Sequence, residues 1–314
     1  KMGGAYHGWS DQLAYGMRVP GTKGIMSKGV PNFVFKHTDE FFPNDLEDLE
    51  RKLKANRLTG GTAAVYLEPM GPESGTRPVS REFVRGAARL ARQYGALLIF
   101  DEVVTGFRIG LSGAQGYFGV DPDLTVFGKI IAGGYPGAGG VGGHADCMAH
   151  LGAGLDSSGK KVPKAMCGGT MAATPISCAA GYFALCEIER TNACETAGRM
   201  GDRLTRGLQA LIKQHSLPFV AFNQGSICHL DNAGTMHFSI DWKKPWTIPE
   251  ILKQTGVRQK EMEHMGAAYM AEGIVTLAGS RLYTSAAYTG EMIDDVLSRF
   301  DRVLSSCAPL EVQP

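Results

Sequence analysis

The sequence lacks several features that would assign it to a broad class at once. No apolar run is long enough to cross a bilayer, so no membrane-spanning helix is expected. Neither sign of charge is in excess, with 32 Lys and Arg against 31 Asp and Glu. We therefore expect no nucleic-acid partner and no anionic-membrane partner. The 44% of apolar residues is ample for a buried core.

The cysteines lack the patterns of a disulfide framework or a metal site. There are seven, an odd number, and no C-x-x-C pair is present. This usage predicts reduced thiols, a cytoplasmic protein and no bound metal.

The chain also lacks an initiator Met and opens on Lys1. We expect a fragment, a processed chain or the ordered part of something longer. Its 314 residues exceed the usual size of a single core. We expect a large domain over residues 1–200 and a small α+β domain over residues 201–314.

The first half of the chain has the pattern of a βαβ unit. Helical periodicity and buried strand-like runs alternate over Asp45–Asn56, Thr62–Leu67, Val79–Tyr94 and Ala96–Phe100. This order predicts an α/β fold with a mainly parallel central sheet flanked by helices. The two strands run into Glu68 and Asp101, where ligands of open α/β sheets bind.

The second half predicts helices and short strands. Helices are expected over Pro175–Glu189, Cys194–His215, Val257–Met270 and Glu291–Ser305, and strands over Phe219–Phe222, Ser226–Leu230 and Thr235–Ile240. This composition is typical of a smaller α+β domain.

One stretch pairs an acid with an amine. Asp101 ends the apolar strand, and Lys129 follows 28 positions later between an apolar run and two isoleucines. Such a position predicts a buried, nucleophilic lysine. An acid and an amine in one apolar site suit pyridoxal 5'-phosphate (PLP), whose aldehyde the amine holds as a Schiff base and whose ring nitrogen the acid keeps protonated.

Three further motifs are weaker by themselves. The glycine-rich Ala132–Gly143 is either a flexible loop or backbone passing close to a cofactor or subunit. Gly168-Gly169-Thr170 is an ordinary turn or an anion-binding one. Tyr6-His7-Gly8 places an aromatic ring either in the core or on a cofactor face.

Together these pieces resemble the class III PLP-dependent aminotransferases of fold type I, nearest to their glutamate-1-semialdehyde aminomutase-like branch. The resemblance is carried by YHG at Tyr6–Gly8, EPMGP at Glu68–Pro72, FDEVVTGFR at Phe100–Arg108, the segment Gly113–Pro136 that contains Lys129, and CGGTMAATPISCAAG at Cys167–Gly181. It covers most of residues 1–181, whereas the tail matches only in outline.

The resemblance implies a role for each residue. Asp101 would hold the ring N–H, and Lys129 would form the Schiff base and move the proton at the substrate Cα. Val103 and Tyr6 would cover the two ring faces, and His7 and Glu68 would lie near the cofactor. Thr170 would reach the phosphate of a neighbouring subunit's cofactor, which implies a homodimer with shared sites.

The sequence departs from the family in three places. The family's phosphate loop precedes the YHG motif, and no such segment is in this sequence. Val104 stands where many members carry a Gln that contacts the cofactor hydroxyl. The aminomutases' C-terminal acid is missing from Ala278–Thr289, where Arg281 could pair with a substrate carboxylate or lie at a strand edge. His229 is a weaker guess as a substrate contact, since a strand residue is its more ordinary role.

Three hypotheses follow. The first is an aminotransferase that moves an amino group between a small amino donor and a carbonyl acceptor. The second is a glutamate-1-semialdehyde 2,1-aminomutase. The third is a non-catalytic fragment or a domain of a larger biosynthetic enzyme.

Overall fold

The computed structural model describes residues 1–17, 20–21, 24–152, 154–155, 158–232, 246 and 248–307. The chain divides into two compact units. The first holds most of the chain up to Arg190, and the second holds the short segment Arg108–Leu111 together with the chain from Thr191 onward. The division into domains at residue 200 stays a prediction.

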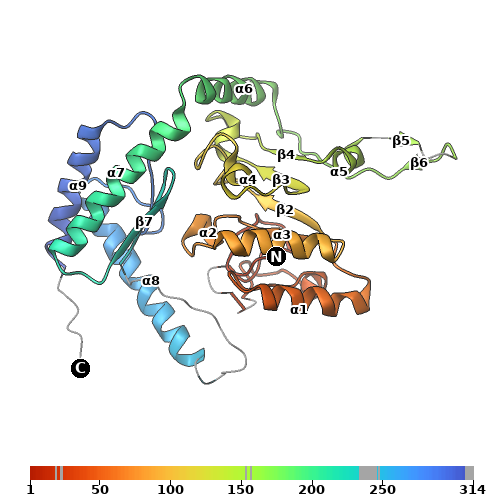
Figure 1. Ribbon diagram of the computed structural model, residues 1–314, viewed down its shortest axis with the longest axis horizontal. Helices are drawn as coiled ribbons and strands as arrows, with labels where there is room; N and C mark the ends of the chain where they lie inside the picture. Colours follow the sequence, from red (N-terminus) through yellow and green to blue (C-terminus); the bar gives the residue numbers. More distant parts are fainter. Residues whose placement is uncertain are drawn as a thin grey trace. The chain divides into compact units, whose positions relative to one another are not determined.

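The first unit is built on a four-stranded sheet in the order β1-β2-β3-β4. Its strands are β1 (Ala64–Leu67), β2 (Leu97–Asp101), β3 (Leu124–Phe127) and β4 (Gly140–Gly143). β1, β2 and β3 are parallel, and β4 pairs with β3 in the antiparallel sense. The predicted α/β fold with a mainly parallel sheet is therefore confirmed (Figure 1).

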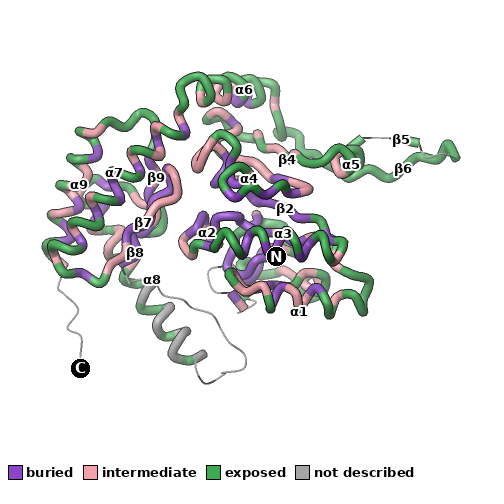
Figure 2. The backbone as a smooth tube through the Cα atoms, viewed as in Figure 1, coloured by how far each residue is buried: buried purple, intermediate pink, exposed green. Residues whose placement is uncertain are grey.

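The first unit also contains helices and short turns. The helices are α1 (Leu46–Asn56), α2 (Pro72–Gly75), α3 (Arg81–Gln93), α4 (Gly113–Phe118), α5 (Ala145–Met148) and α6 (Pro175–Arg190). Turns of 3₁₀ helix are η1 (Asn32–His37), η2 (Arg57–Thr59), η3 (Lys129–Ala132) and η4 (Ala149–Leu151), and β5 (Gly154–Leu155) pairs with β6 (Lys161–Val162). Figure 2 shows that α3 has a buried and an exposed face and that β2 is buried toward its carboxyl end, whereas α6 is largely exposed.

α3 joins the sheet to α1. The Ser80 side chain caps its N-terminus by accepting the Phe83 N–H at 3.0 Å. One face of α3 packs on β1 and β2, and another meets α1 (Figure 1). Gly86 permits that approach, because a Cβ at this position would lie 2.3 Å from Leu46 Cδ1. This packing holds β1 and β2 in place, and with them their carboxyl ends.

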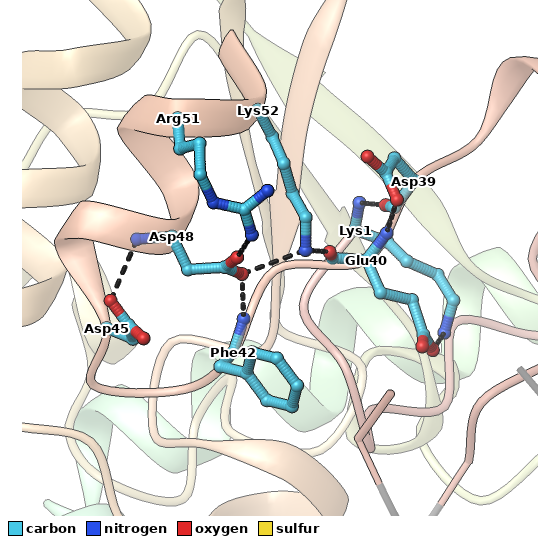
Figure 3. A network of polar contacts seen from close by, with 8 residues as sticks. All are labelled: Lys1, Asp39, Glu40, Phe42, Asp45, Asp48, Arg51 and Lys52. Atoms are coloured by element: carbon cyan, nitrogen blue, oxygen red, sulfur yellow. Dashed lines mark hydrogen bonds and ion pairs between the residues drawn. The ribbon is translucent and has the colours of Figure 1, made fainter. Parts of the chain in front are cut away.

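Polar contacts hold the N-terminal segment beside α1 (Figure 3). Asp48 in α1 accepts the Phe42 N–H at 3.0 Å and pairs with Lys52 Nζ at 2.9 Å. Lys52 Nζ also donates to the backbone oxygen of Glu40, whose carboxylate lies 3.6 Å from the buried Lys1 Nζ. The segment continues along β1, where the Met2 N–H donates to the Tyr66 carbonyl at 2.9 Å. The YHG motif, a few residues further along this segment, therefore lies beside the sheet.

The second unit packs one helix on an antiparallel sheet and a second helix on the first. Its elements are α7 (Ala193–Gln214), β7 (Val220–Gln224), β8 (Ile227–Asp231), α8 (Ile248–Ala271), β9 (Arg281–Tyr283) and α9 (Gly290–Leu304), with sheet order β7-β8-β9. α7 and α9 lie side by side, and a Cβ on Gly207 would lie 2.3 Å from Leu297 Cδ1. Leu208, Tyr269 and Phe300 are fully buried in its core, where the last two rings meet edge to face at 5.0 Å.

Most predicted elements appear within a few residues of their expected bounds. α8 is the largest exception, because it begins at Ile248 rather than Val257. The expected strand over Thr235–Ile240 lies outside the described residues. The glycine-rich segment was not predicted as a strand, yet part of it forms β4. Within the described part of the chain, no helix is long and apolar enough to span a bilayer.

Candidate active site

Two carboxyl groups stand at neighbouring strand ends. Leu67 and Phe100 are paired in the β1–β2 register, so Glu68 and Asp101 follow at the same edge of the sheet. Both side chains are buried. Their neighbours differ, and the difference decides what each can bind.

Asp101 is held mainly by other side chains. His7 Nδ1 lies 2.9 Å from Asp101 Oδ2, and the Tyr66 hydroxyl lies 3.5 Å from the same oxygen. The Val103 N–H donates to Oδ1 at 3.2 Å. A carboxylate offers about four acceptor positions. One position on Oδ1 therefore stays open toward a further donor.

His7 is completely enclosed at this position. Its ring stacks on Tyr66 with centroids 4.1 Å apart and an angle of 21° between the planes. Burial lowers the His7 pKa, although the contact with Asp101 opposes this effect. A neutral ring that carries its proton on Nδ1 donates to Asp101. Nε2 is buried and has no hydrogen-bond partner among the described residues.

Within the described part of the chain, Glu68 is held by backbone N–H groups alone. Oε1 accepts the N–H groups of Tyr6 at 2.9 Å and Glu73 at 3.3 Å, and Oε2 accepts that of Ser74 at 2.7 Å. Glu73 and Ser74 have φ values of 53° and 63°, so their N–H groups converge through left-handed backbone. Burial raises the pKa of Glu68 to about 7, even though the three donors lower it.

Lys129 follows the next strand. Asp101 pairs with Val126 in the β2–β3 register, and Lys129 stands three residues further on. Its φ is 51°, a left-handed conformation that few non-glycine residues adopt. The prediction that Lys129 is buried was wrong, because the structure leaves it exposed. The isoleucines that follow, Ile130 and Ile131, are themselves only half-buried and do not enclose it.

Val103 joins the Asp101 loop to the Lys129 loop. A Cβ on Gly128 would lie 3.1 Å from Val103 Cγ1, so the glycine lets the two loops approach. Tyr6 is 47% exposed, which argues against a core role for its ring. Its backbone is tied to Glu68, so the side chain starts at the edge where the two acids stand.

The other predicted residues belong to other segments of the chain. Gly168, Gly169 and Thr170 are exposed in a turn before α6. Arg281 belongs to the second unit, where it pairs in register with the buried His229 across β8 and β9. His229 stacks on Phe222 at 4.7 Å, which fits its ordinary role as a strand residue.

Tyr66 is the residue of this cluster that the sequence did not single out. It belongs to no motif and reads only as a strand residue. What places it there is the β1–β2 register, in which Tyr66 pairs with Ile99, two residues before Asp101. Its ring stacks on His7 of the YHG segment.

Comparison with known proteins identifies the family. The sequence profile of "Aminotransferase class-III" matches residues 1–278. The chain belongs to the class III aminotransferases. The resemblance predicted from the motifs is thereby confirmed.

Curated class III relatives match nearly the whole chain. Glutamate-1-semialdehyde 2,1-aminomutase 1 of Macrococcus caseolyticus is 34% identical over 310 residues, which are 96% of this chain and 66% of that protein. The corresponding enzyme of Pyrobaculum neutrophilum is 34% identical over 309 residues, 97% of this chain and 68% of that protein. The chain thus spans about two thirds of the length of these relatives.

Solved structures support the fold. An omega-transaminase from Sphaerobacter thermophilus superposes with a TM-score of 0.79 at 26% identity, over 96% of this chain and 67% of that one. A glutamate-1-semialdehyde aminomutase from Pseudomonas aeruginosa gives 0.71 at 22% identity, over 96% and 64%, and shows the fold alone. The predicted fold type I, with its mostly parallel sheet and flanking helices, is confirmed.

Proposed function

We propose that this chain forms the PLP-binding core of an aminotransferase that moves an amino group between a small amino donor and a carbonyl acceptor. The observation that carries the proposal is the pairing of Asp101 with the strand that leads into Lys129. The open acceptor position on Asp101 Oδ1 suits a flat ring with a protonated nitrogen.

PLP, when bound, supplies an aldehyde that condenses with amines and a ring that accepts the electron pair released at the substrate Cα. Lys129 would hold the cofactor through Nζ and would take and return the proton at the substrate Cα. Asp101 Oδ1 would accept the ring N–H and keep that nitrogen protonated. His7, buried against Asp101 Oδ2, would fix which oxygen faces the ring.

The remaining assignments follow the family pattern. Val103 and Tyr6 would cover the two faces of the ring, and Glu68 would hold the Tyr6 backbone at the cofactor. Thr170 would reach the phosphate bound to a second subunit. Arg281 would pair with a substrate carboxylate through its planar guanidinium.

A homodimer is proposed for the same reason. Large apolar side chains are exposed around Thr170 and along α6, namely Met166, Met171, Ile176, Tyr182 and Phe183. Exposed apolar side chains gathered in one segment of the chain favour an interaction site there. A second copy of the chain would cover it and bring Thr170 to the partner's cofactor. Light scattering that gives the mass of a single chain would contradict this proposal.

A cytoplasmic location is also proposed. All seven cysteines are free thiols, as expected for a protein of a reducing compartment.

Borohydride reduction of the PLP-loaded protein tests the main proposal. Reduction is expected to attach the cofactor irreversibly to one lysine, and peptide mapping should find it on Lys129. Lys129→Arg should abolish the attachment, whereas Lys52→Arg serves as a control because Lys52 is engaged by Asp48 and Glu40. Attachment to another lysine, or none in cofactor-loaded protein, would contradict the proposal.

The aminomutase reaction is a second candidate. It is favoured by the curated relatives, which carry that name and match 96–97% of this chain. Supplying glutamate-1-semialdehyde without any second substrate separates the two functions. Formation of 5-aminolevulinate under those conditions supports the aminomutase, and its absence supports intermolecular transfer.

A further inference from the structure

Tyr66 occupies a position in the site that the reaction scheme does not use. It stands in β1, and its neighbours Val65 and Leu67 point into the core on the opposite face. Tyr66 is instead half-buried, with its hydroxyl 3.5 Å from Asp101 Oδ2 and its ring stacked on His7. A purely structural tyrosine has no need to direct its hydroxyl at the one carboxylate that the cofactor requires.

The two oxygens of Asp101 are occupied unequally. Oδ2 faces two side-chain donors, His7 Nδ1 at 2.9 Å and the Tyr66 hydroxyl at 3.5 Å. Among the described residues, Oδ1 accepts only the Val103 N–H, at 3.2 Å. The arrangement saturates one oxygen and leaves capacity on the other. Rotation of the carboxyl group would break both side-chain contacts together.

Tyr66 is suited to remain a donor. Burial raises its pKa far above the ordinary value, and the nearby Asp101 and Glu68 raise it further. The charged or titratable groups around its hydroxyl are thus Asp101 from β2, Glu68 at the end of β1 and His7 from the N-terminal segment. The raised pKa keeps the phenol protonated at neutral pH, so its hydroxyl can donate to the carboxylate.

We propose that Tyr66 is a positioning residue for Asp101: with its ring it holds His7 in place, and with its hydroxyl it shares Oδ2, so that Oδ1 is presented to the ring nitrogen of the cofactor. This inference rests on the proposed role of Asp101. It adds a strand residue outside any motif to the contacts of Asp101, which otherwise come from the YHG and DEVVTGFR motifs.

Two substitutions separate the two parts of this role. Tyr66→Phe removes the hydroxyl and keeps the ring that stacks on His7, whereas Tyr66→Leu removes both. Tyr94→Phe is the matched control, because the Tyr94 hydroxyl also lies 3.0 Å from a carboxylate, that of Glu50, but away from the site.

The first measurement needs no cofactor. In the full-length protein with ¹⁵N-labelled histidine, the His7 Nδ1–H proton is observed by NMR and assigned with His7→Gln. In Tyr66→Phe this resonance is expected to move downfield, because His7 becomes the sole side-chain donor to Oδ2. The Tyr94→Phe spectrum should match that of the wild type. An unchanged His7 resonance in Tyr66→Phe would overturn the inference, whatever the reaction is.

The second measurement uses PLP and its visible absorption. Loss of one hydrogen bond predicts that Tyr66→Phe binds PLP roughly five-fold more weakly than the wild type, and Tyr66→Leu still more weakly. Equal affinity and an identical absorption band in Tyr66→Phe and wild type would overturn the role toward the cofactor. If the wild type itself took up no PLP while the His7 resonance moved as expected, the proposed function would fail and the positioning of Asp101 would stand.

Discussion

The loops that follow β1 and β2 each hold a buried acid, but they do so with different kinds of hydrogen-bond donor. Each buries a carboxyl group at the same edge of the sheet. The β1 loop gives Glu68 the N–H groups of Glu73 and Ser74, and the N-terminal segment adds that of Tyr6, so both oxygens accept backbone donors. The β2 loop gives Asp101 a single backbone donor and leaves the rest to His7 and Tyr66. Both acids receive three donors, but Glu68 is held by backbone whereas Asp101 is held mainly by the side chains of His7 and Tyr66, so only the setting of Asp101 can be changed by substituting a donor side chain.

The largest expected effect is on the Asp101 side. Asp101→Asn removes the charge that keeps a ring nitrogen protonated and turns part of the group into a donor. We expect kcat/KM for amino transfer to fall by roughly a thousand-fold. Steady-state kinetics with the best available donor would measure it. A loss of less than ten-fold would place the electrostatic centre of the site elsewhere.

A substitution in the loop that holds Glu68 should lower the free energy of unfolding. Gly71 begins the loop with φ 108°, and a Cβ there would lie 2.0 Å from the Arg77 carbonyl oxygen. Gly71→Ala is therefore expected to destabilise the protein by about 3 kcal/mol. Gly60→Ala is the matched control, because Gly60 has φ 107° but open space around it. Its cost should be nearer 1 kcal/mol, from strain alone.

Urea unfolding measures both free energies. Equal losses in the two variants would show that the Glu68 loop yields to a side chain, and the contrast between the loops would then weaken.

Glu68 itself should make stability depend on pH. Its pKa is about 7 in the folded chain against an ordinary 4.5, so the folded state resists ionisation. The stabilising contribution is complete below pH 4.5 and is lost as pH rises through about 7, a fall of roughly 3 kcal/mol. Glu68→Gln cannot ionise and should lack that fall. Both proteins contain His7, whose lowered pKa has the opposite effect on stability. Subtracting the unfolding free energy of Glu68→Gln from that of the wild type at each pH removes this contribution. Parallel curves for wild type and Glu68→Gln from pH 4.5 to 8 would contradict this.

The smallest effect is expected where the two cofactor loops meet. Gly128 has an extended φ of −159°, which any residue adopts, and an added Cβ would need Val103 to shift by a few tenths of an ångström. Gly128→Ala should cost about 1 kcal/mol of PLP affinity and little stability. Absorbance titration and thermal unfolding separate the two. A large fall in melting temperature with unchanged affinity would make this contact structural.

Local patterns in the sequence predicted much of the fold. The N-cap residue Ser80 and the apolar face that follows it predicted α3. The apolar runs predicted β1 and β2. β4 escaped prediction because Gly140, Val141, Gly142 and Gly143 offer almost no side-chain pattern, and its place depends on pairing with β3. α8 begins at Ile248, nine residues before the predicted start at Val257, so the sequence pattern indicated only the second part of this helix.

The candidate site divides in the same way. Asp101, Lys129 and Glu68 stand in motifs, so their neighbourhood at the strand ends could be inferred from strand order. Tyr66 could not, since its role arises from a register that joins it to Asp101 across the sheet. The exposure of Lys129 was also beyond the sequence, because the apolar residues beside it turned out to be only half-buried.

The most direct test of the contrast between the two acids is the protonation of the cofactor ring. ¹⁵N NMR of PLP labelled at the pyridine nitrogen, bound to the full-length protein, reports whether that nitrogen carries a proton. We predict a protonated nitrogen in the wild type and in Glu68→Gln, and loss of the proton in Asp101→Asn. A nitrogen that stays protonated in Asp101→Asn, or loses its proton in Glu68→Gln, would contradict the account.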